Sequence, residues 1–209
     1  MLRRLTTKKT EKIVFGKGCP LSSAHAEDYP CDHSIQRLEK RACELSGIEL
    51  EKAKEIDEYN LATLLGEFTI TTLYEKFYAK VLEDKDDWFR EMFQTPLEDL
   101  VANESEYLIQ RLGGPSYYTD RKGIPSLLKI HYNFEISPRT AEKWLEYMET
   151  TLEEMVTEID EPTRDVLMSF FRFSAYFMIA SQEAQATMVK FAHHDRIKQE
   201  FELEADMKI

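Results

Sequence analysis

The sequence predicts an all-α fold, with one helical domain and extra segments at both ends. Apolar side chains recur at helical spacing in several stretches after residue 33. Prolines and glycines stand between these stretches, where they end one helix before another begins. The chain of 209 residues is also long enough to bury a sizeable core. We therefore expect a lead over 1–32, a domain over 33–190 and a charged tail over 191–209.

The lead over 1–32 is predicted to be disordered. It is cationic and contains glycine, proline and serine, but it has no helical stripe of apolar residues. Its first ten residues, MLRRLTTKKT, are basic and free of acids, as organelle import segments are. Because the segment lacks a sustained amphipathic face, a plain extension is the favoured interpretation and a targeting role is the alternative.

Two short helices should precede the core. The first spans 34–45, with Ser34 as its N-cap and Gly47 just beyond its end. The second spans about 57–65, with Asp57 as its cap.

The helix predicted over 68–82 is more strongly amphipathic. Tyr74 and Tyr78 lie beside its apolar stripe, which turns the Tyr78 hydroxyl toward the core. A tyrosine in such a place is most often a core aromatic anchored by one hydrogen bond. The stripe itself consists of Ile70, Leu73, Phe77 and Val81. After an acidic turn over 83–87, the chain returns to the core with Trp88, Phe89, Met92 and Phe93.

A further helix should run from Pro96 to Leu112. Proline is favourable in a first turn, and the acids that follow it suit the positive end of the helix dipole. The run Gly113-Gly114-Pro115 then ends the helix. One side of the helix is formed by Leu100, Glu104, Tyr107, Leu108 and Arg111.

His131 is expected on a short helix that follows a loop, SYYTDRK. Gly123 and Pro125 leave room for only a few helical residues, which include Leu127, Leu128 and His131. A histidine in this setting can present an imidazole nitrogen to a buried metal with an open coordination position, and a haem iron fits best. Taken alone, a single histidine is more often a core or surface residue than a ligand.

Two helices complete the predicted domain. Ser137 caps the first, Pro138 takes its first position, and the run from Asp160 to Pro162 ends it. Its buried face should contain Trp144, Leu145, Met148, Leu152, Met155, Val156 and Ile159. The last helix should bury Val166, Leu167, Phe170, Phe171, Ser174, Phe177 and Met178. Beyond about Ser181 the pattern thins into a charged tail, which we expect to be helical in part and to offer a dimer contact.

The composition of the chain limits the kinds of partner and the cellular location that we expect for the protein. The formal net charge of −12 disfavours nucleic acids and anionic membrane surfaces, because both reward clustered cations. No apolar run approaches the length of a transmembrane helix. The odd number of cysteines (Cys19, Cys31 and Cys43) favours free thiols and a reducing compartment. We therefore expect a soluble cytoplasmic protein, with import into an organelle as the alternative.

The order and spacing of several motifs resemble those of a known family. The matching residues are Phe77-Tyr78, Trp88-Phe89, Phe93, Gln110-Arg111-Leu112-Gly113-Gly114-Pro115, Tyr118, Arg121-Lys122-Gly123, Pro125, His131, Phe134, Trp144-Leu145 and Met148. Together they resemble the truncated, 2-on-2 haemoglobins of group II, and among them the plant-type members. The similarity spans roughly residues 38–180. It implies a truncated globin fold, a 2-on-2 helical sandwich with extra helical segments at both ends.

The resemblance also implies a haem site. His131 would be the proximal ligand of the iron of haem b. Tyr78 and Trp144 would supply the distal hydrogen-bond donors, and Phe93 would wedge against the porphyrin. Phe134 would be an apolar contact just past the ligand. Groups near the haem propionates would be Tyr118, Arg121 and Lys122. The remaining contacts would be Leu100, Glu104, Tyr107, Leu108, Arg111, Leu128 and Met148.

The function implied is reversible binding of O2, and also of CO and NO, for O2 or NO chemistry rather than bulk oxygen transport. The candidate reactions are NO dioxygenation, nitrite reduction and peroxidase-like turnover, with a reductase as partner. An O2 or NO store or sensor without turnover is the alternative. The protein would work as a monomer or a homodimer.

Four residues depart from the family pattern. Leu100 stands where a small residue is commoner and should narrow access to the distal pocket. Glu104 stands where relatives carry glutamine or an apolar residue. It would either accept a hydrogen bond from Tyr78 or Trp144, which would weaken their hold on O2, or turn out to solvent. If it stays inside, it is the candidate acid–base residue, which would relay protons to bound peroxide or nitrite. Ile124 and Ile130 replace a histidine and an arginine that are frequent in relatives, which puts in doubt any contact those residues would make.

Overall fold

The computed structural model describes residues 31–125, 131 and 134–206, and within these ranges it contains helices and no strand. The all-α prediction is therefore confirmed. The predictions for residues 1–30, and those for Leu127, Leu128 and Ile130, lie outside the described residues. The elements are α1 (Cys31–Ser46), α2 (Leu50–Lys54), η1 (Glu55–Asp57), α3 (Leu61–Leu65), α4 (Glu67–Leu82), α5 (Asp87–Arg90), α6 (Leu97–Arg111), α7 (Tyr117–Lys122), α9 (Pro138–Glu153) and α10 (Glu161–Asp206).

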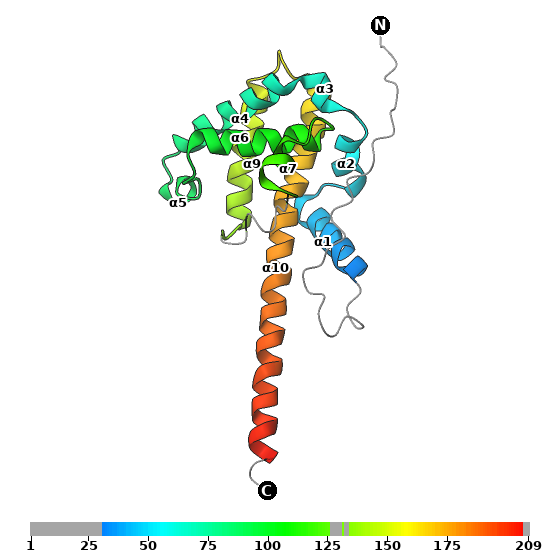
Figure 1. Ribbon diagram of the computed structural model, residues 1–209, viewed down its shortest axis with the longest axis vertical. Helices are drawn as coiled ribbons and strands as arrows, with labels where there is room; N and C mark the ends of the chain where they lie inside the picture. Colours follow the sequence, from blue (N-terminus) through cyan, green and yellow to red (C-terminus); the bar gives the residue numbers. More distant parts are fainter. Residues whose placement is uncertain (1–30, 126–130, 132–133, 207–209) are drawn as a thin grey trace.

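Four of these helices form the body of the domain. α4 packs on both α6 and α9, and α9 packs on α10, so that two pairs of helices enclose the core (Figure 1). α1 lies along α10 and covers it on the side away from α9. The side chains buried most completely between the four helices include Leu73, Phe77, Leu108, Leu145, Met148, Leu152 and Leu167. This arrangement is the expected sandwich of helices.

The apolar stripe of α4 lies in the core as its periodicity predicts. Ile70, Leu73, Phe77 and Val81 are all buried, and so are Tyr74 and Tyr78 beside them. Phe68, in the first turn of the helix, is 84% exposed and contributes nothing to this core.

Two of the predicted N-caps are wrong. Ser34 lies inside α1, which already begins at Cys31. Asp57 ends the short η1, and the cap of the following helix is Asn60, whose side chain accepts a hydrogen bond from the Thr63 amide at 3.1 Å. Both errors have one cause, because several polar residues able to cap a helix lie close together at each start and the pattern does not choose among them.

The start of α9 is as predicted. Ser137 accepts a hydrogen bond from the Thr140 amide at 3.2 Å, and Pro138 takes the first helical position. The predicted end of this helix, at the run from Asp160 to Pro162, is too late. α9 ends at Glu153, and a run of turns follows. Those turns keep Met155 and Ile159 buried but leave Val156 54% exposed, so the predicted burial of Val156 is wrong.

The stretch that was expected to be a loop contains α7. Gly113, with φ of 91°, ends α6, and Gly114 packs so closely on α6 that a Cβ there would lie 2.7 Å from Ile109 Cγ2. These two glycines therefore let the chain turn tightly before α7 begins. Gly123, with φ of 84°, ends α7. Six residues without an apolar stripe gave no periodic signal of a helix.

The final helix is longer than expected. Where thinning of the pattern suggested a partly helical tail after Ser181, α10 continues to Asp206 and extends well beyond the domain (Figure 1). No proline or glycine follows Pro162, so nothing in the sequence interrupts this helix. At the edge of the domain α10 is tied to α1 through Arg41, whose Nε lies 3.0 Å from Glu183 Oε2.

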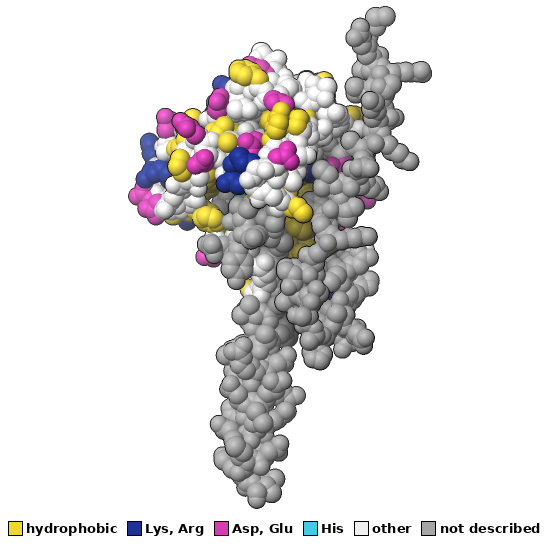
Figure 2. Space-filling model, in the orientation of Figure 1, with side chains coloured by type: hydrophobic (Ala, Val, Ile, Leu, Met, Phe, Trp, Pro, Cys, Tyr) yellow, Lys and Arg dark blue, Asp and Glu magenta, His cyan; other side chains and the backbone are white. Residues whose placement is uncertain are grey.

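Acidic and basic side chains are interspersed over the surface of the domain. Figure 2 shows lysines and arginines beside aspartates and glutamates on one face, with hydrophobic side chains between them. Many of these charges are paired, as between Arg121 and Glu106 at 2.6 Å. Within the described part of the chain, no helix combines the length and the apolar character needed to cross a bilayer.

Candidate functional site

Aromatic rings from four parts of the chain meet beside α4. The Tyr78 ring lies edge-on to Phe77, with 5.0 Å between ring centroids, and edge-on to Phe93 at 5.9 Å. Phe77 also contacts Trp144 of α9 at 5.1 Å, and Trp144 contacts Phe171 of α10 at 5.6 Å. The structure thus brings Tyr78, Phe93 and Trp144 into one aromatic cluster around the fully buried Phe77.

Two tyrosine residues on this face of α4 are almost completely buried. Tyr78 is 3% exposed and Tyr74 is 2% exposed. A wall of aromatic rings that also carries phenol hydroxyl groups is chemically suited to a large apolar cofactor with a polar ligand, and haem has this character.

Glu104 introduces a titratable carboxyl group on the neighbouring helix α6. Its side chain is half-buried and has no ion pair among the described residues. Burial raises the pKa of Glu104 to about 7, because a charged carboxylate is disfavoured away from water. The pKa values of Tyr74 and Tyr78 are raised well above their usual range, first by burial and then by the negative charge of Glu104. Glu104 is thus electrostatically coupled to both phenols.

Two further tyrosines border the same carboxyl group. The rings of Tyr107 on α6 and Tyr118 on α7 contact each other edge-on, with centroids 5.9 Å apart. Burial raises the pKa of Tyr107 to about 12, and the pKa of Tyr118 is also raised, by burial first and then by Glu104. Four tyrosines on three helices therefore face the electrostatic influence of one carboxyl group.

Two of the three cationic residues predicted at the site, Arg111 and Arg121, bind protein side chains. Arg111 pairs with Asp57, with 3.0 Å between Nη2 and Oδ2, and its guanidinium lies over the Phe170 ring at 5.1 Å. Arg121 donates hydrogen bonds to Glu106 and Asn103 and, like Lys122, is exposed. Among the other predicted contacts, Leu108 and Met148 are fully buried and Leu100 is half-buried against the core. Leu128 lies outside the described residues.

One side chain of α10, that of Gln182, bonds the backbone at His131, Phe134 and Ile136. The His131 carbonyl accepts a hydrogen bond from the Phe134 amide at 3.1 Å and one from Gln182 Nε2 at 3.3 Å. Gln182 Nε2 also donates to the Phe134 carbonyl at 2.6 Å, and Gln182 Oε1 accepts from the Ile136 amide at 3.0 Å. Sequence reasoning missed Gln182, because a hydrogen bond across 51 positions leaves no periodic signal.

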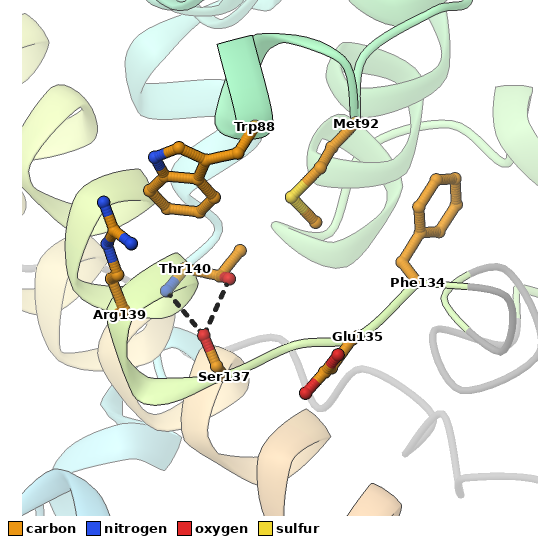
Figure 3. Close-up of a pocket in the computed structure, with 7 residues that line it drawn as sticks. All are labelled: Trp88, Met92, Phe134, Glu135, Ser137, Arg139 and Thr140. Carbon is orange, nitrogen blue, oxygen red and sulfur yellow. Dashed lines mark hydrogen bonds between the residues drawn. The ribbon is translucent and has the colours of Figure 1, made fainter. Parts of the chain in front are cut away.

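An open pocket of about 380 Å³ lies beside this segment, between α5 and the start of α9. Phe134, 39% exposed, lines it together with Trp88 and Met92 (Figure 3). The Arg139 guanidinium lies over the Trp88 ring at 4.2 Å. The structure therefore places Phe134 at a solvent-facing pocket rather than in the closed core. The rest of the lining is Glu135, Ser137, Arg139 and Thr140.

Comparisons with known proteins identify the family and the fold. Residues 62–178 match the family model described as bacterial-like globin. The chain is 38% identical over 160 residues to two-on-two hemoglobin-3 of Arabidopsis thaliana, covering 76% of this chain and 91% of the plant protein. The group II truncated hemoglobin from Bacillus anthracis, known from a crystal structure, has 30% sequence identity to this chain. The two structures superpose with a TM-score of 0.52 over 57% of this chain and 89% of that one. The truncated oxygen-avid haemoglobin from Bacillus subtilis is 26% identical, with a TM-score of 0.51, covering 56% of this chain and 96% of that one.

Proposed function

Because the chain belongs to the bacterial-like globin family, as a truncated haemoglobin of group II, we propose that His131 binds the iron of haem b and that Tyr78 and Trp144 present hydrogen-bond donors to a diatomic gas. Membership of the globin family carries haem binding and oxygen binding with it. The type of haem, the residues in contact with it and the use made of oxygen are the parts that we propose.

The observation that carries this proposal is a pair of donors fixed by packing. The Tyr78 ring is held between Phe77 and Phe93, and the Trp144 ring between Phe77 and Phe171. Haem supplies an iron with one coordination position open to a diatomic gas. Donors that are already oriented need no reorganisation to bond a partly negative ligand. Each such bond is worth about 1.5–3 kcal/mol, so that two of them would slow release of the gas by about two to four decades.

Slow release suits capture or chemistry better than delivery. One solved relative, from Bacillus subtilis, is described as oxygen-avid, which is the behaviour that we propose for this chain. Leu100, half-buried on α6, would narrow the approach on the same side. CO and NO would bind at the same position as O2.

The assignment of His131 is tested by the visible spectrum. Protein supplied with haemin should show a Soret band, and His131→Ala should shift or remove it, because the imidazole is the proposed ligand. An unchanged spectrum in His131→Ala would exclude His131 as the ligand.

The role of Tyr78 is tested by the rate of O2 release. Tyr78→Phe keeps the ring contacts and removes only the hydroxyl, so O2 should leave about ten- to a hundredfold faster in stopped-flow experiments. Tyr74→Phe is the matched control, because it removes another buried hydroxyl one turn away on the same helix face. Equal effects of the two changes would contradict a specific role for Tyr78.

A second candidate function is turnover of nitrite, peroxide or NO, and Glu104 favours it. A carboxyl group with a pKa of about 7 can both hold and release a proton near neutral pH, as a general acid–base residue must. Reduction of nitrite and cleavage of peroxide both consume protons, which Glu104 is suited to supply. Such turnover would require electrons from a reductase, whereas a store or sensor would not.

The rate of nitrite reduction distinguishes turnover from a role as a store or sensor. Under anaerobic conditions with excess dithionite, Glu104→Gln should slow nitrite reduction about tenfold or more and flatten its pH dependence, because an amide cannot supply a proton. Glu106→Gln, two positions along α6 and paired with Arg121, should leave the rate unchanged. The store or sensor would be favoured if neither variant altered the rate.

A further inference from the structure

Gln182 forms a clamp on three backbone groups of one short segment. Its Nε2 lies 2.6 Å from the Phe134 carbonyl and 3.3 Å from the His131 carbonyl, and its Oε1 lies 3.0 Å from the Ile136 amide. The segment carries no regular secondary structure over 134–137, so its backbone groups are not satisfied within a helix. One side chain therefore provides the hydrogen bonds that a helix would otherwise provide.

An amide side chain is well matched to this set of backbone groups. Two carbonyl oxygens require N–H donors and one amide requires an acceptor, and glutamine carries both kinds of atom at one end. A carboxylate would offer only acceptors, and an ammonium group only donors. The glutamine side chain is long enough to reach from α10 to all three groups, at 2.6 to 3.3 Å.

The part of α10 that carries Gln182 is itself firmly held. The neighbouring Ile179, Ala180 and Ser181 are buried, and the Ser181 hydroxyl donates to the Phe177 carbonyl at 2.7 Å. On the other side of Gln182, Glu183 accepts two hydrogen bonds from Arg41 of α1, at 3.0 and 3.4 Å. A residue on such a rigid element can fix the geometry of whatever it bonds.

We propose that Gln182 is the positioning residue for His131. By bonding the backbone of His131, Phe134 and Ile136, it would set the direction from which the imidazole approaches the iron of a bound haem, and it would resist movement of the ligand away from it. This inference rests on the proposed function, in which His131 is the ligand. Gln182 and Arg41 both lie outside the residues 62–178 that match the family, so the clamp comes from a part of this chain beyond the matched globin region.

The clamp can be tested on the holoprotein with Gln182→Ala. Resonance Raman spectra of the ferrous protein without gas should show the iron–histidine stretching band shifted or broadened, because the imidazole is no longer held in one orientation. Haem loss to an excess of a haem scavenger should be about tenfold faster, the equivalent of about 1.4 kcal/mol. Hydrogen exchange at the Ile136 amide should also speed up, since that amide loses its acceptor. Gln185→Ala, an exposed glutamine one turn further along α10, is the matched control and should change none of these.

The Gln182→Glu variant adds a readout that a purely structural role would not move. Its ionised carboxylate would face the carbonyls of His131 and Phe134 without a donor, so the iron–histidine band should be disturbed at pH 8. Protonation restores one O–H donor while keeping an acceptor for the Ile136 amide, so the band should return toward that of the unsubstituted protein at pH 5.5. The unsubstituted protein, measured at the same two pH values, corrects for other titrating groups. This variant also preserves the test if Gln182→Ala does not fold.

The outcomes separate this inference from the function on which it rests. An iron–histidine band that is normal in the unsubstituted protein and unchanged in Gln182→Ala and Gln182→Glu would overturn the clamp alone. Absence of that band from the unsubstituted protein would overturn the assignment of His131 and, with it, this inference. A shifted band with faster haem loss in Gln182→Ala, and partial return of the band at pH 5.5 in Gln182→Glu, would support both.

Discussion

The wall that carries Tyr78 and Trp144 and the segment that carries His131 are held in place by different kinds of contact. The wall is built from long helices, and its functional side chains are fixed by rings that contact one another around the buried Phe77. The His131 segment instead depends on Gln182, which donates hydrogen bonds to the carbonyls of His131 and Phe134 and accepts one from the Ile136 amide. Packing therefore fixes one side of the proposed site, and directed polar bonds fix the other.

This difference indicates which property each side should lose when it is mutated. The packed wall should lose stability when a buried side chain is shortened, because the cavity that is left removes contacts from the surrounding core. A segment held by a few hydrogen bonds can lose its geometry while the fold remains intact, because each bond is worth only about 0.5–1.5 kcal/mol. Changes in the wall should thus act mainly on stability, and changes at the segment mainly on the ligand.

The largest effect is expected from Phe77→Ala. Phe77 is fully buried and contacts both Tyr78 and Trp144, so its removal should cost about 3–5 kcal/mol of the free energy of unfolding, measured by urea denaturation. Phe68→Ala, on the same helix but 84% exposed, should cost less than about 0.5 kcal/mol. Similar losses for the two variants would show that the wall does not depend on packing around Phe77.

A pH-dependent effect is expected from Glu104→Gln. Because burial raises the folded-state pKa of Glu104 from 4.5 to about 7, the folded protein holds this proton more tightly than the unfolded chain. The associated stability is fully present below pH 4.5 and is lost as pH rises through about 7. Between these limits the protein should lose up to about 3 kcal/mol through this group, and Glu104→Gln should abolish that loss.

Urea denaturation at pH 5 and pH 8 measures this difference. The surface pair of Glu106 and Arg121 provides the control, since Glu106→Gln should alter stability by less than about 1 kcal/mol at either pH. A pH dependence that survives unchanged in Glu104→Gln would mean that this carboxyl group is not buried in solution.

Gly114→Ala tests the connection between the two regions. Gly114 lies where the chain leaves α6 and turns toward α7 and the His131 segment. A Cβ there would lie 2.7 Å from Ile109 Cγ2 and 2.8 Å from the Ile109 carbonyl oxygen, so either the turn or the end of α6 must shift. We expect a loss of about 1–3 kcal/mol in the free energy of unfolding, measured by urea denaturation. A variant of full stability would show that this turn is looser than the structure indicates.

The smallest effect is expected from Ser137→Ala, at the end of the His131 segment. Ser137 caps α9 by accepting from the Thr140 amide, so its loss should cost about 1 kcal/mol in thermal or urea denaturation. Ser116 precedes α7 without such a bond, which makes Ser116→Ala the matched control with almost no expected change. If Ser137→Ala and Ser116→Ala lowered the free energy of unfolding equally, the hydrogen bond of Ser137 would not be a source of stability.

The two regions also differ in how far the sequence predicted them. The stripe of α4 and the start of α9 followed from helical spacing and from Ser137 followed by proline, because both signals lie within one turn or one helix. The residues proposed for the site came from motif order, and the structure places Tyr78, Phe93 and Trp144 in one cluster.

What the sequence did not reveal depends on contacts between distant parts of the chain. Gln182 bonds a segment 46 to 51 positions away, and no local pattern marks such a residue. The contacts of the Arg111 guanidinium with Asp57 and Phe170 were not predicted either, because both partners come from other elements. α7 was missed for a different reason, because six residues between two breaks are too few to display a period.

The length of α10 has a consequence for how the protein behaves in solution. Its 46 residues extend about 69 Å at 1.5 Å per residue, whereas a compact chain of 209 residues has a radius of gyration of only about 17 Å. A particle with such a projection experiences more friction than a sphere of equal mass, so it should elute early from a gel-filtration column. An early peak would therefore not by itself distinguish two chains from one, and mass from light scattering or sedimentation equilibrium should be used to count them.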